Sequence, residues 1–264
     1  MRNIYLFCVL LLSLVVGCGS SLHTPVRSPD SLHQHLGNVT VALVYQGVDD
    51  DGNKFVKPYC TGVWLSDDQI LTAGHCAEAV ARMDKKLDED DPVDPVGNPV
   101  HYIVSVEVPD AKEEEPSAVH FGHVTSFDED HDLALITASA GNIPEHDNAS
   151  LASEIPALGE RVYVVGHPRG LYWSYIEGVV SAYRNHPEVG MTVQVSAPVW
   201  FGNSGGGVFD SHGGLVGIAS RLARAPNTAL FIHEDSIKKF LNTVKERQER
   251  HDAFKQLQES EQKK

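Results

Sequence analysis

The chain of 264 residues is long enough for two small domains with a sizeable buried core, and its 22 glycines and 14 prolines indicate a globular protein with many turns. Its formal net charge of −15 argues against nucleic acid as a partner, because binding to phosphates needs a basic surface. The acidic runs at 49–51, 88–91, 113–115 and 128–130 are expected to be solvated loops; a calcium site is the alternative, although no spacing matches a known calcium-binding loop.

The first 17 residues have the pattern of a secretory signal. Arg2 precedes an apolar run over residues 4–16 that is too short to span a membrane comfortably as a mature helix. The exit at residues 15–18 resembles a bacterial lipobox, in which Cys18 is acylated and becomes the new N-terminus. The alternatives are a signal that merely ends near a cysteine and an uncleaved anchor. We therefore predict an exported protein, held at a cell-envelope membrane by acyl chains on Cys18.

Residues 18–37 contain Ser, Pro and His without periodicity and are expected to form a linker. From Val39 onward the pattern changes to short β-rich runs separated by turn residues, which indicates an all-β barrel or sandwich architecture. The runs lie at 39–45, 61–65, 69–72, 101–108, 119–124, 133–137, 161–165, 172–182, 191–195, 206–209, 215–220 and 229–232. We place a first β domain at 38–145 and a second at 146–235.

The segment 236–264 differs from the rest of the chain. Ile237, Phe240, Leu241 and Val244 recur at helical spacing, which predicts one helix docked on the β domains. Beyond Lys245 the residues are nearly all charged or Gln. This tail is expected to be an exposed or frayed helix.

The positions of the cysteines and histidines bear on two other kinds of site, a disulfide and a metal site. Cys8 lies inside the signal and Cys18 is the predicted acylation site, which leaves Cys60 and Cys76; two cysteines in an exported domain most often pair. The histidine pairs 33/35 and 120/123 could bind a metal, but no third ligand is near either pair in sequence. No metal site is expected.

Acyl transfer by a serine needs a hydroxyl, a base beside it, a carboxylate that holds the base, and donors for the oxyanion. The sequence Gly202-Asn203-Ser204-Gly205-Gly206 places a serine among glycines. Such a turn can aim the N–H groups of Gly202 and Ser204 at one point. By itself, a serine in a Gly-rich turn is a weak signal.

Two further motifs supply the base and the carboxylate. His75 follows a predicted strand in Leu71-Thr72-Ala73-Gly74-His75-Cys76, and Asp132 begins the apolar run 133–136, where its carboxylate can be buried behind a histidine. Alone, His75 is one of 14 histidines and Asp132 is the end of an acidic surface run.

Together these motifs resemble the chymotrypsin-like serine peptidases. The order His, Asp, Ser is the order of that family, and the segment from Cys60 to Cys76 is similar to the strand pair ahead of its histidine. Residues 215–220 resemble the strand that lines the substrate cleft. The resemblance covers roughly residues 38–245.

The resemblance implies two antiparallel six-stranded β-barrels with a C-terminal α-helix. It implies a catalytic triad of His75, Asp132 and Ser204 in the cleft between the barrels, and an oxyanion hole formed by the Gly202 and Ser204 amides. A disulfide between Cys60 and Cys76 has the spacing found in the family, and Ser220 stands where the family has a serine bonded to the triad aspartate. Protein or peptide substrates are implied, without a cofactor.

Within the family, the segments 159–170 and 176–182 are similar to the second barrel of bacterial HtrA proteases, and the glutamyl endopeptidases belong to the same branch. An HtrA-like chaperone and protease is one alternative; it predicts a PDZ domain or a trimerisation segment, and neither is recognisable in the sequence. A binding protein on a protease fold is the other alternative; it predicts a lost triad member, and none is lost. Oligomeric state is not indicated.

The residue before the serine bears on activation. Many trypsin-like enzymes mature when a new amino terminus pairs with an aspartate at that position, which here is the uncharged Asn203. No Ile-Val-Gly-Gly-like start is present near Val39. We therefore expect no proteolytic activation step.

The residues around the primary pocket are mostly apolar. Pro198 stands where trypsin has the aspartate that selects Arg and Lys, and Val199, Trp200 and Phe201 follow it. Trp200 and Phe201 could belong to the core, but the resemblance favours the pocket wall. Small or medium apolar side chains are expected as substrates, with acidic ones second because Arg221 follows Ser220 on the cleft strand.

Overall fold

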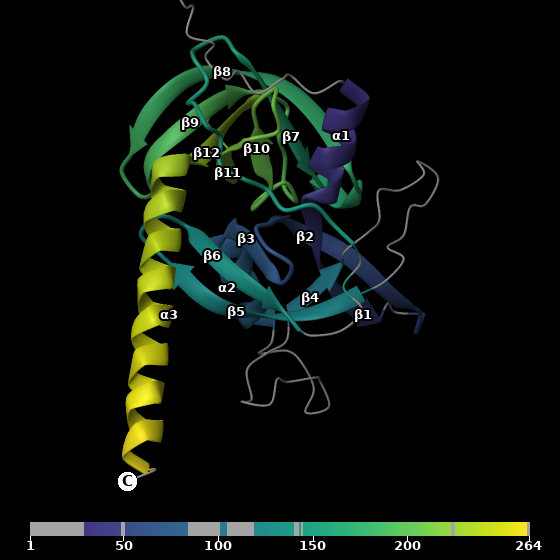
Figure 1. Cartoon of the computed structure of the whole chain (residues 1–264). Helices are drawn as coiled ribbons and strands as arrows, with labels where there is room; N and C mark the ends of the chain where they lie inside the picture. The colour runs from purple at the N-terminus through teal and green to yellow at the C-terminus, as the bar shows by residue number, and fades with distance from the viewer. Residues whose placement is uncertain are drawn as a thin grey trace, which may run out of the picture.

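The computed structural model describes residues 29–48, 51–83, 101–104, 119–139, 143, 145–222 and 225–262. The first half of the chain forms a closed antiparallel barrel in the strand order β1-β2-β3-β6-β5-β4 (Figure 1). Its strands are β1 (Thr40–Val48), β2 (Lys54–Trp64), β3 (Gln69–Ala73), β4 (His101–Val104), β5 (Val119–Asp128) and β6 (Leu133–Ala138).

A second closed barrel follows in the order β10-β11-β12-β9-β8-β7. Its strands are β7 (Arg161–Gly166), β8 (Ser174–His186), β9 (Gly190–Ser196), β10 (Gly207–Phe209), β11 (Leu215–Leu222) and β12 (Thr228–His233). Closure leaves neither sheet with free edges. The predicted fold class, two six-stranded antiparallel barrels with a C-terminal helix, is confirmed.

The C-terminal helix α3 (Glu234–Gln262) is longer than its apolar stripe. Its first turns pack on the barrels through Ile237 and Phe240, and the remainder projects past the first barrel as an exposed helix (Figure 1). This agrees with the exposed helix expected beyond Lys245.

Two helices were not predicted. Helix α1 (Pro29–Asn38) replaces the last part of the expected linker, so the linker prediction is wrong for residues 29–37. Leu32 and Leu36, one helical turn apart, are both buried, and this pair anchors α1 to the core. Helix α2 (Gly74–Met83) begins directly after the strand that precedes His75, and a short 3₁₀ turn η2 (Pro168–Gly170) follows β7.

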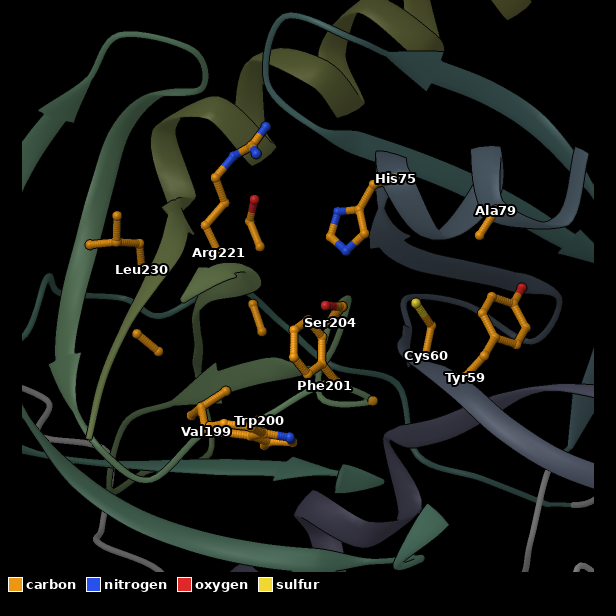
Figure 2. A pocket seen from close by; sticks show the side chains of 14 residues that line it. Tyr59, Cys60, His75, Ala79, Val199, Trp200, Phe201, Ser204, Arg221 and Leu230 are labelled. Carbon is orange, nitrogen blue, oxygen red and sulfur yellow. The ribbon is translucent and has the colours of Figure 1, made fainter. Parts of the chain in front are cut away.

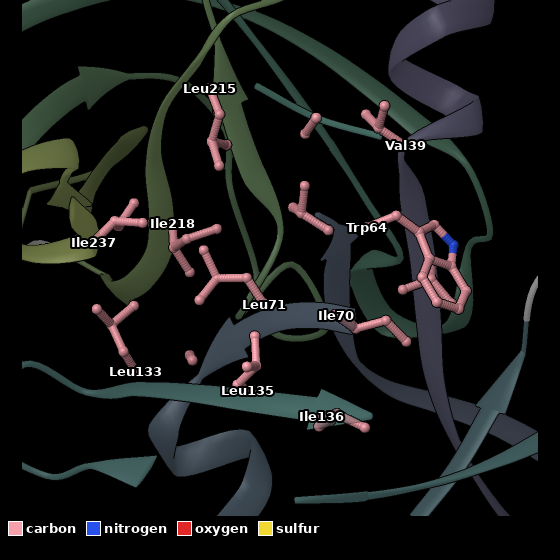
Figure 3. Close-up of a cluster of buried hydrophobic side chains, with 14 of the residues drawn as sticks. Val39, Trp64, Ile70, Leu71, Leu133, Leu135, Ile136, Leu215, Ile218 and Ile237 are labelled. Atoms are coloured by element: carbon pink, nitrogen blue, oxygen red, sulfur yellow. The ribbon is translucent and has the colours of Figure 1, made fainter. Parts of the chain in front are cut away.

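The apolar core extends between the barrels. Leu71, Leu133 and Leu135 of the first barrel belong to one buried cluster with Leu215 and Ile218 of the second (Figure 3). Ile237 of α3 belongs to the same cluster. The barrels are therefore joined by shared hydrophobic burial, which fixes the position of the cleft between them.

The predicted signal at 1–17, Cys18 and the linker up to residue 28 lie outside the described residues, as do most of the acidic runs. Among the helices of the described ranges, none combines the length and the apolar character needed to cross a bilayer.

Candidate active site

His75 and Asp132 are joined at the start of α2. The imidazole Nδ1 of His75 lies 3.0 and 2.9 Å from the two carboxylate oxygens of Asp132, and the His75 backbone N–H donates to Asp132 Oδ1 at 2.7 Å. The carboxylate thus satisfies a free N–H of the first helical turn while it orients the ring. The His75 side chain is 42% exposed and that of Asp132 only 7%, so the ring faces the cleft and the carboxylate lies behind it.

The Ser220 hydroxyl of β11 also donates to Asp132 Oδ2, which links the second barrel to this carboxylate. Burial raises the pKa of the Asp132 carboxyl, but the hydrogen bond from His75, the charge of His75 and the Ser220 hydroxyl outweigh burial. The net pKa lies below its ordinary value. Asp132 therefore remains ionised and can hold the imidazole in one orientation and tautomer.

Ser204 lies in the tight turn before β10. Its carbonyl accepts a hydrogen bond from the Thr61 N–H at 2.8 Å, and the next N–H, of Gly205, donates to the Ala219 carbonyl at 2.7 Å. Gly205 has a φ of +81°, and a Cβ there would lie 2.0 Å from Thr72 Oγ1. The turn therefore requires glycine at this position and is packed directly against the first barrel.

The disulfide between Cys60 and Cys76 joins β2 to α2, with a Cα–Cα distance of 6.1 Å. It ties the first turn of the helix that carries His75 to the strand beside Ser204. Possible ligand atoms of Cys60, His75 and Cys76 lie within 4.8 Å of one another. Because the two sulfurs are bonded to each other, they offer no thiolate to a metal while the disulfide is intact.

The four histidines considered as metal ligands do not gather. Within the described ranges, neither His33 and His35 nor His120 and His123 belong to a group of three possible ligands. His35 instead pairs with Asp147 at 2.8 Å and helps to hold α1 against the segment between the barrels.

A cavity of about 640 Å³ opens between the barrels, and the His75 ring and the Ser204 hydroxyl both face it (Figure 2). Gly202 also lines it, so the two predicted oxyanion donors belong to residues at the cavity surface. Of the predicted pocket residues, Val199, Trp200, Phe201, Ser220 and Arg221 line this cavity.

Pro198 does not line the cavity, and its placement in the pocket is wrong. Along residues 196–200 exposed and buried positions alternate, so Val199 faces inward and Pro198 is turned to solvent. Sequence reasoning missed several lining residues that have no motif of their own and are placed only by barrel closure. They are Tyr59, Ala79, Ala229 and Leu230, whereas Ala219 belongs to the cleft strand 215–220 that the sequence indicated.

Arg221 lies at the cavity wall and is paired with Glu188 of the β8–β9 turn, with Nη2 and Oε2 3.2 Å apart. Both side chains are largely exposed, so the pair contributes little to stability. The pair bears on specificity, because Glu188 neutralises part of the charge that Arg221 presents at the cavity wall.

Comparisons with known proteins agree with this geometry. Residues 60–218 match the family model described as the trypsin-like peptidase domain. The chain is 32% identical over 120 residues to Protease Do-like 1, chloroplastic, of Arabidopsis thaliana, which covers 41% of this chain and 24% of that protein. It is 35% identical over 98 residues to a probable periplasmic serine endoprotease DegP-like of Hahella chejuensis, covering 36% of this chain and 20% of that protein. The matches therefore span only about a quarter and a fifth of these relatives.

A solved structure shares the fold. The inactive form of Rv3671c from M. tuberculosis, a serine-to-alanine mutant, superposes with a TM-score of 0.57 over 83% of this chain and 96% of that chain, at 16% sequence identity. The expected class, a serine-type endopeptidase of the trypsin-like fold, is confirmed at the level of the family. The chain belongs to the family of trypsin-like peptidase domains.

Proposed function

We propose that this chain is an exported serine endopeptidase that hydrolyses peptide bonds through His75, Asp132 and Ser204. The observation that carries the proposal is that His75, which lines the same cavity as Ser204, is bonded to a buried, ionised Asp132. A surface histidine with an incidental partner would not account for Ser220, which reaches the same carboxylate from the other barrel.

The proposed reaction has two halves, acylation of Ser204 and hydrolysis of the acyl-enzyme. His75 accepts the proton of the Ser204 hydroxyl as that oxygen bonds to the substrate carbonyl carbon, and the Gly202 and Ser204 N–H groups stabilise the resulting oxyanion. His75 then returns the proton to the leaving amine, which leaves an acyl-enzyme. In the second half, His75 accepts a proton from a water molecule as the water oxygen bonds to the acyl carbon. The proton then returns to the Ser204 oxygen as the acid is released. Asp132 fixes the imidazole and stabilises its charged form throughout.

The lining of the cavity favours apolar substrate side chains. Val199, Ala219 and Ala229 are small or medium apolar residues, and no carboxylate is found among the described residues that line it. A buried Lys or Arg would lose hydration without compensation, so cleavage after basic residues is disfavoured. Arg221 supports an acidic preference as the second candidate, although its pairing with Glu188 weakens that preference.

A peptide library tests both the triad and the preference. Wild-type enzyme is expected to cleave mainly after small or medium apolar residues. Ser204→Ala and His75→Ala are each expected to lose activity by a factor of about 10⁴–10⁶ with unchanged unfolding, because triad members act as a unit. Substantial activity in purified Ser204→Ala, free of contaminating protease, would refute the triad. Dominant cleavage after Lys or Arg would refute the substrate preference alone.

The export and lipid anchor belong to the same proposal. The pattern of residues 1–17 followed by Cys18 supports it, and one relative is named as periplasmic. Acyl chains on Cys18 would hold the catalytic barrels at a membrane surface. The mass of the N-terminal peptide from the membrane fraction is expected to show an acylated Cys18, and an unmodified Cys18 in the exported protein would exclude the anchor.

A further inference from the structure

The Phe201–Gly202 peptide is held by the turn after β7, whose residues 167–170 are not among those that line the cavity. The Phe201 carbonyl accepts a hydrogen bond from the Arg169 N–H at 2.9 Å. Arg169 belongs to η2, the turn that follows β7, and its guanidinium lies 5.0 Å from the ring centre of Trp200. A Cβ on Gly202 would lie 2.2 Å from the His167 carbonyl oxygen, so the turn and the Gly202 backbone are in direct contact.

This contact determines where the Gly202 N–H points. A trans peptide directs its C=O and its N–H to opposite sides, and the described residues contain no cis peptide bond. Because the Phe201 carbonyl is turned toward η2, the Gly202 N–H is turned away from it, toward the cavity that Gly202 lines. The reversed peptide would present a carbonyl oxygen to the oxyanion and would repel it.

The next carbonyl is fixed from the first barrel. The Thr61 hydroxyl of β2 donates to the Gly202 carbonyl at 2.7 Å, and the Thr61 N–H donates to the Ser204 carbonyl at 2.8 Å. Thr61 is fully buried, so its hydroxyl is shielded from competing water. Gly202 has a φ of +99°, a conformation that glycine adopts without strain. The two barrels thus hold successive carbonyls of the same loop.

We propose that Thr61 and the turn 167–170 act as a brace that keeps residues 201–204, the oxyanion loop, in their active orientation. Thr61 is then a positioning residue. The inference rests on the proposed peptidase function and extends it to activation. Asn203 carries no charge for an ion pair with a new amino terminus; its side-chain amide instead donates to the Trp200 carbonyl at 3.1 Å. In other trypsin-like enzymes that ion pair orders the oxyanion loop. Here we infer that the brace does so without a new amino terminus.

The first test compares three variants of the full chain. Thr61→Val removes the hydroxyl at nearly constant shape, whereas Thr61→Ser keeps a hydroxyl. Thr40→Val is the matched control, because it removes a buried hydroxyl that bonds the Leu36 carbonyl away from the cleft. Thr61→Val is expected to lower kcat by about tenfold or more, approaching the roughly 10²–10³-fold loss on removal of an oxyanion donor, with KM changed less than about threefold. Affinity for a peptide aldehyde, whose adduct carries the oxyanion, is expected to fall in parallel.

Thr61→Ser and Thr40→Val are expected to keep kcat and aldehyde affinity near those of wild type. If the kcat of Thr61→Val lies within about twofold of the kcat values of Thr61→Ser and Thr40→Val, the brace is refuted. A wild-type enzyme that does not react with a serine-directed phosphonate at Ser204 would instead refute the proposed function, so the two failures are distinguishable.

A second pair of variants decides the matter if Thr61→Val does not fold. Arg169 has a φ of +52° and an exposed side chain. Glycine fits this φ and retains the N–H, whereas valine is strained there, and both lose the guanidinium over Trp200. Arg169→Val is expected to have a kcat at least about fivefold below that of Arg169→Gly. Equal kcat values in these two variants would overturn the brace.

Discussion

Asp132 combines contacts within the proposed triad with structural contacts in one residue. Its carboxylate accepts the hydrogen bonds of His75 and Ser220, and its carbonyl accepts the Gly74 N–H at 2.8 Å. Its φ of +53° is uncommon for a residue other than glycine, although Asp tolerates it better than most. Such a conformation persists only when its surroundings determine it, and here the contacts come from α2 and from β11.

The His167 side chain is fully buried, and the His167 carbonyl contacts the backbone of Gly202. Its Nδ1 accepts a hydrogen bond from the Trp173 N–H at 3.2 Å, which requires the neutral ring. Burial lowers the pKa of the imidazole to about 3, although the backbone of Val41 acts in the opposite direction. Between about pH 6.5 and 3 the ring therefore stays neutral in the folded protein, whereas the same side chain takes up a proton in the unfolded chain.

This difference predicts an acid-dependent loss of stability. The folded pKa lies below the unfolded value of 6.5, so the contribution of His167 is complete above pH 6.5 and is lost as the pH falls toward 3. The slope from this group approaches about 1.4 kcal/mol per pH unit. His167→Asn, which keeps an acceptor for Trp173, is expected to remove that slope in urea unfolding at pH 7, 5.5 and 4.5.

The matched control is His251→Asn on the exposed part of α3, which is expected to keep the wild-type dependence. The two variants together separate burial from the mere loss of a histidine. An unchanged slope in His167→Asn would contradict a neutral buried ring.

Residues with a local motif could be predicted and residues that act through distant partners could not. His75, Asp132 and Ser204 each lie in a short distinctive segment, and their order adds to the signal. The brace between Thr61 and Gly202 joins residues 141 positions apart, and neither has a pattern that points to the other. The Pro198 error has a similar origin, because the alternation that turns it outward depends on which face of the segment the barrel buries.

At the scale of elements, the strands were predictable because β-rich runs and turn residues are local signals. The helices were less so. Helix α1 contains only two large apolar residues, Leu32 and Leu36, too few to stand out among its polar neighbours. In the first turn of α2 the His75 N–H donates to the carboxylate of Asp132, 57 residues away, so the start signal of this helix is absent from its own segment.

At the scale of the whole molecule, the cleft depends on how α3 and the shared core hold the barrels together. Phe240 is 4% exposed and belongs to the same buried cluster as Leu133 and Ile218, one from each barrel. It also borders a hollow of about 350 Å³ whose opposite wall is the turn that precedes Asp132. Loss of this ring would therefore affect both barrels and the segment that leads to Asp132.

A pair of phenylalanines on one helix tests this dependence. Phe240→Ala is expected to lower the free energy of unfolding by about 3–5 kcal/mol, because it removes buried apolar surface and leaves a cavity. Phe254→Ala, at a site 59% exposed, is expected to change it by less than about 0.5 kcal/mol. Denaturant unfolding followed by intrinsic fluorescence and by residual peptidase activity is expected to give coincident transitions for both variants, since the barrels share one core. Separate transitions in Phe240→Ala would show that the barrels unfold independently, and equal losses in the two variants would contradict the docking role of Phe240.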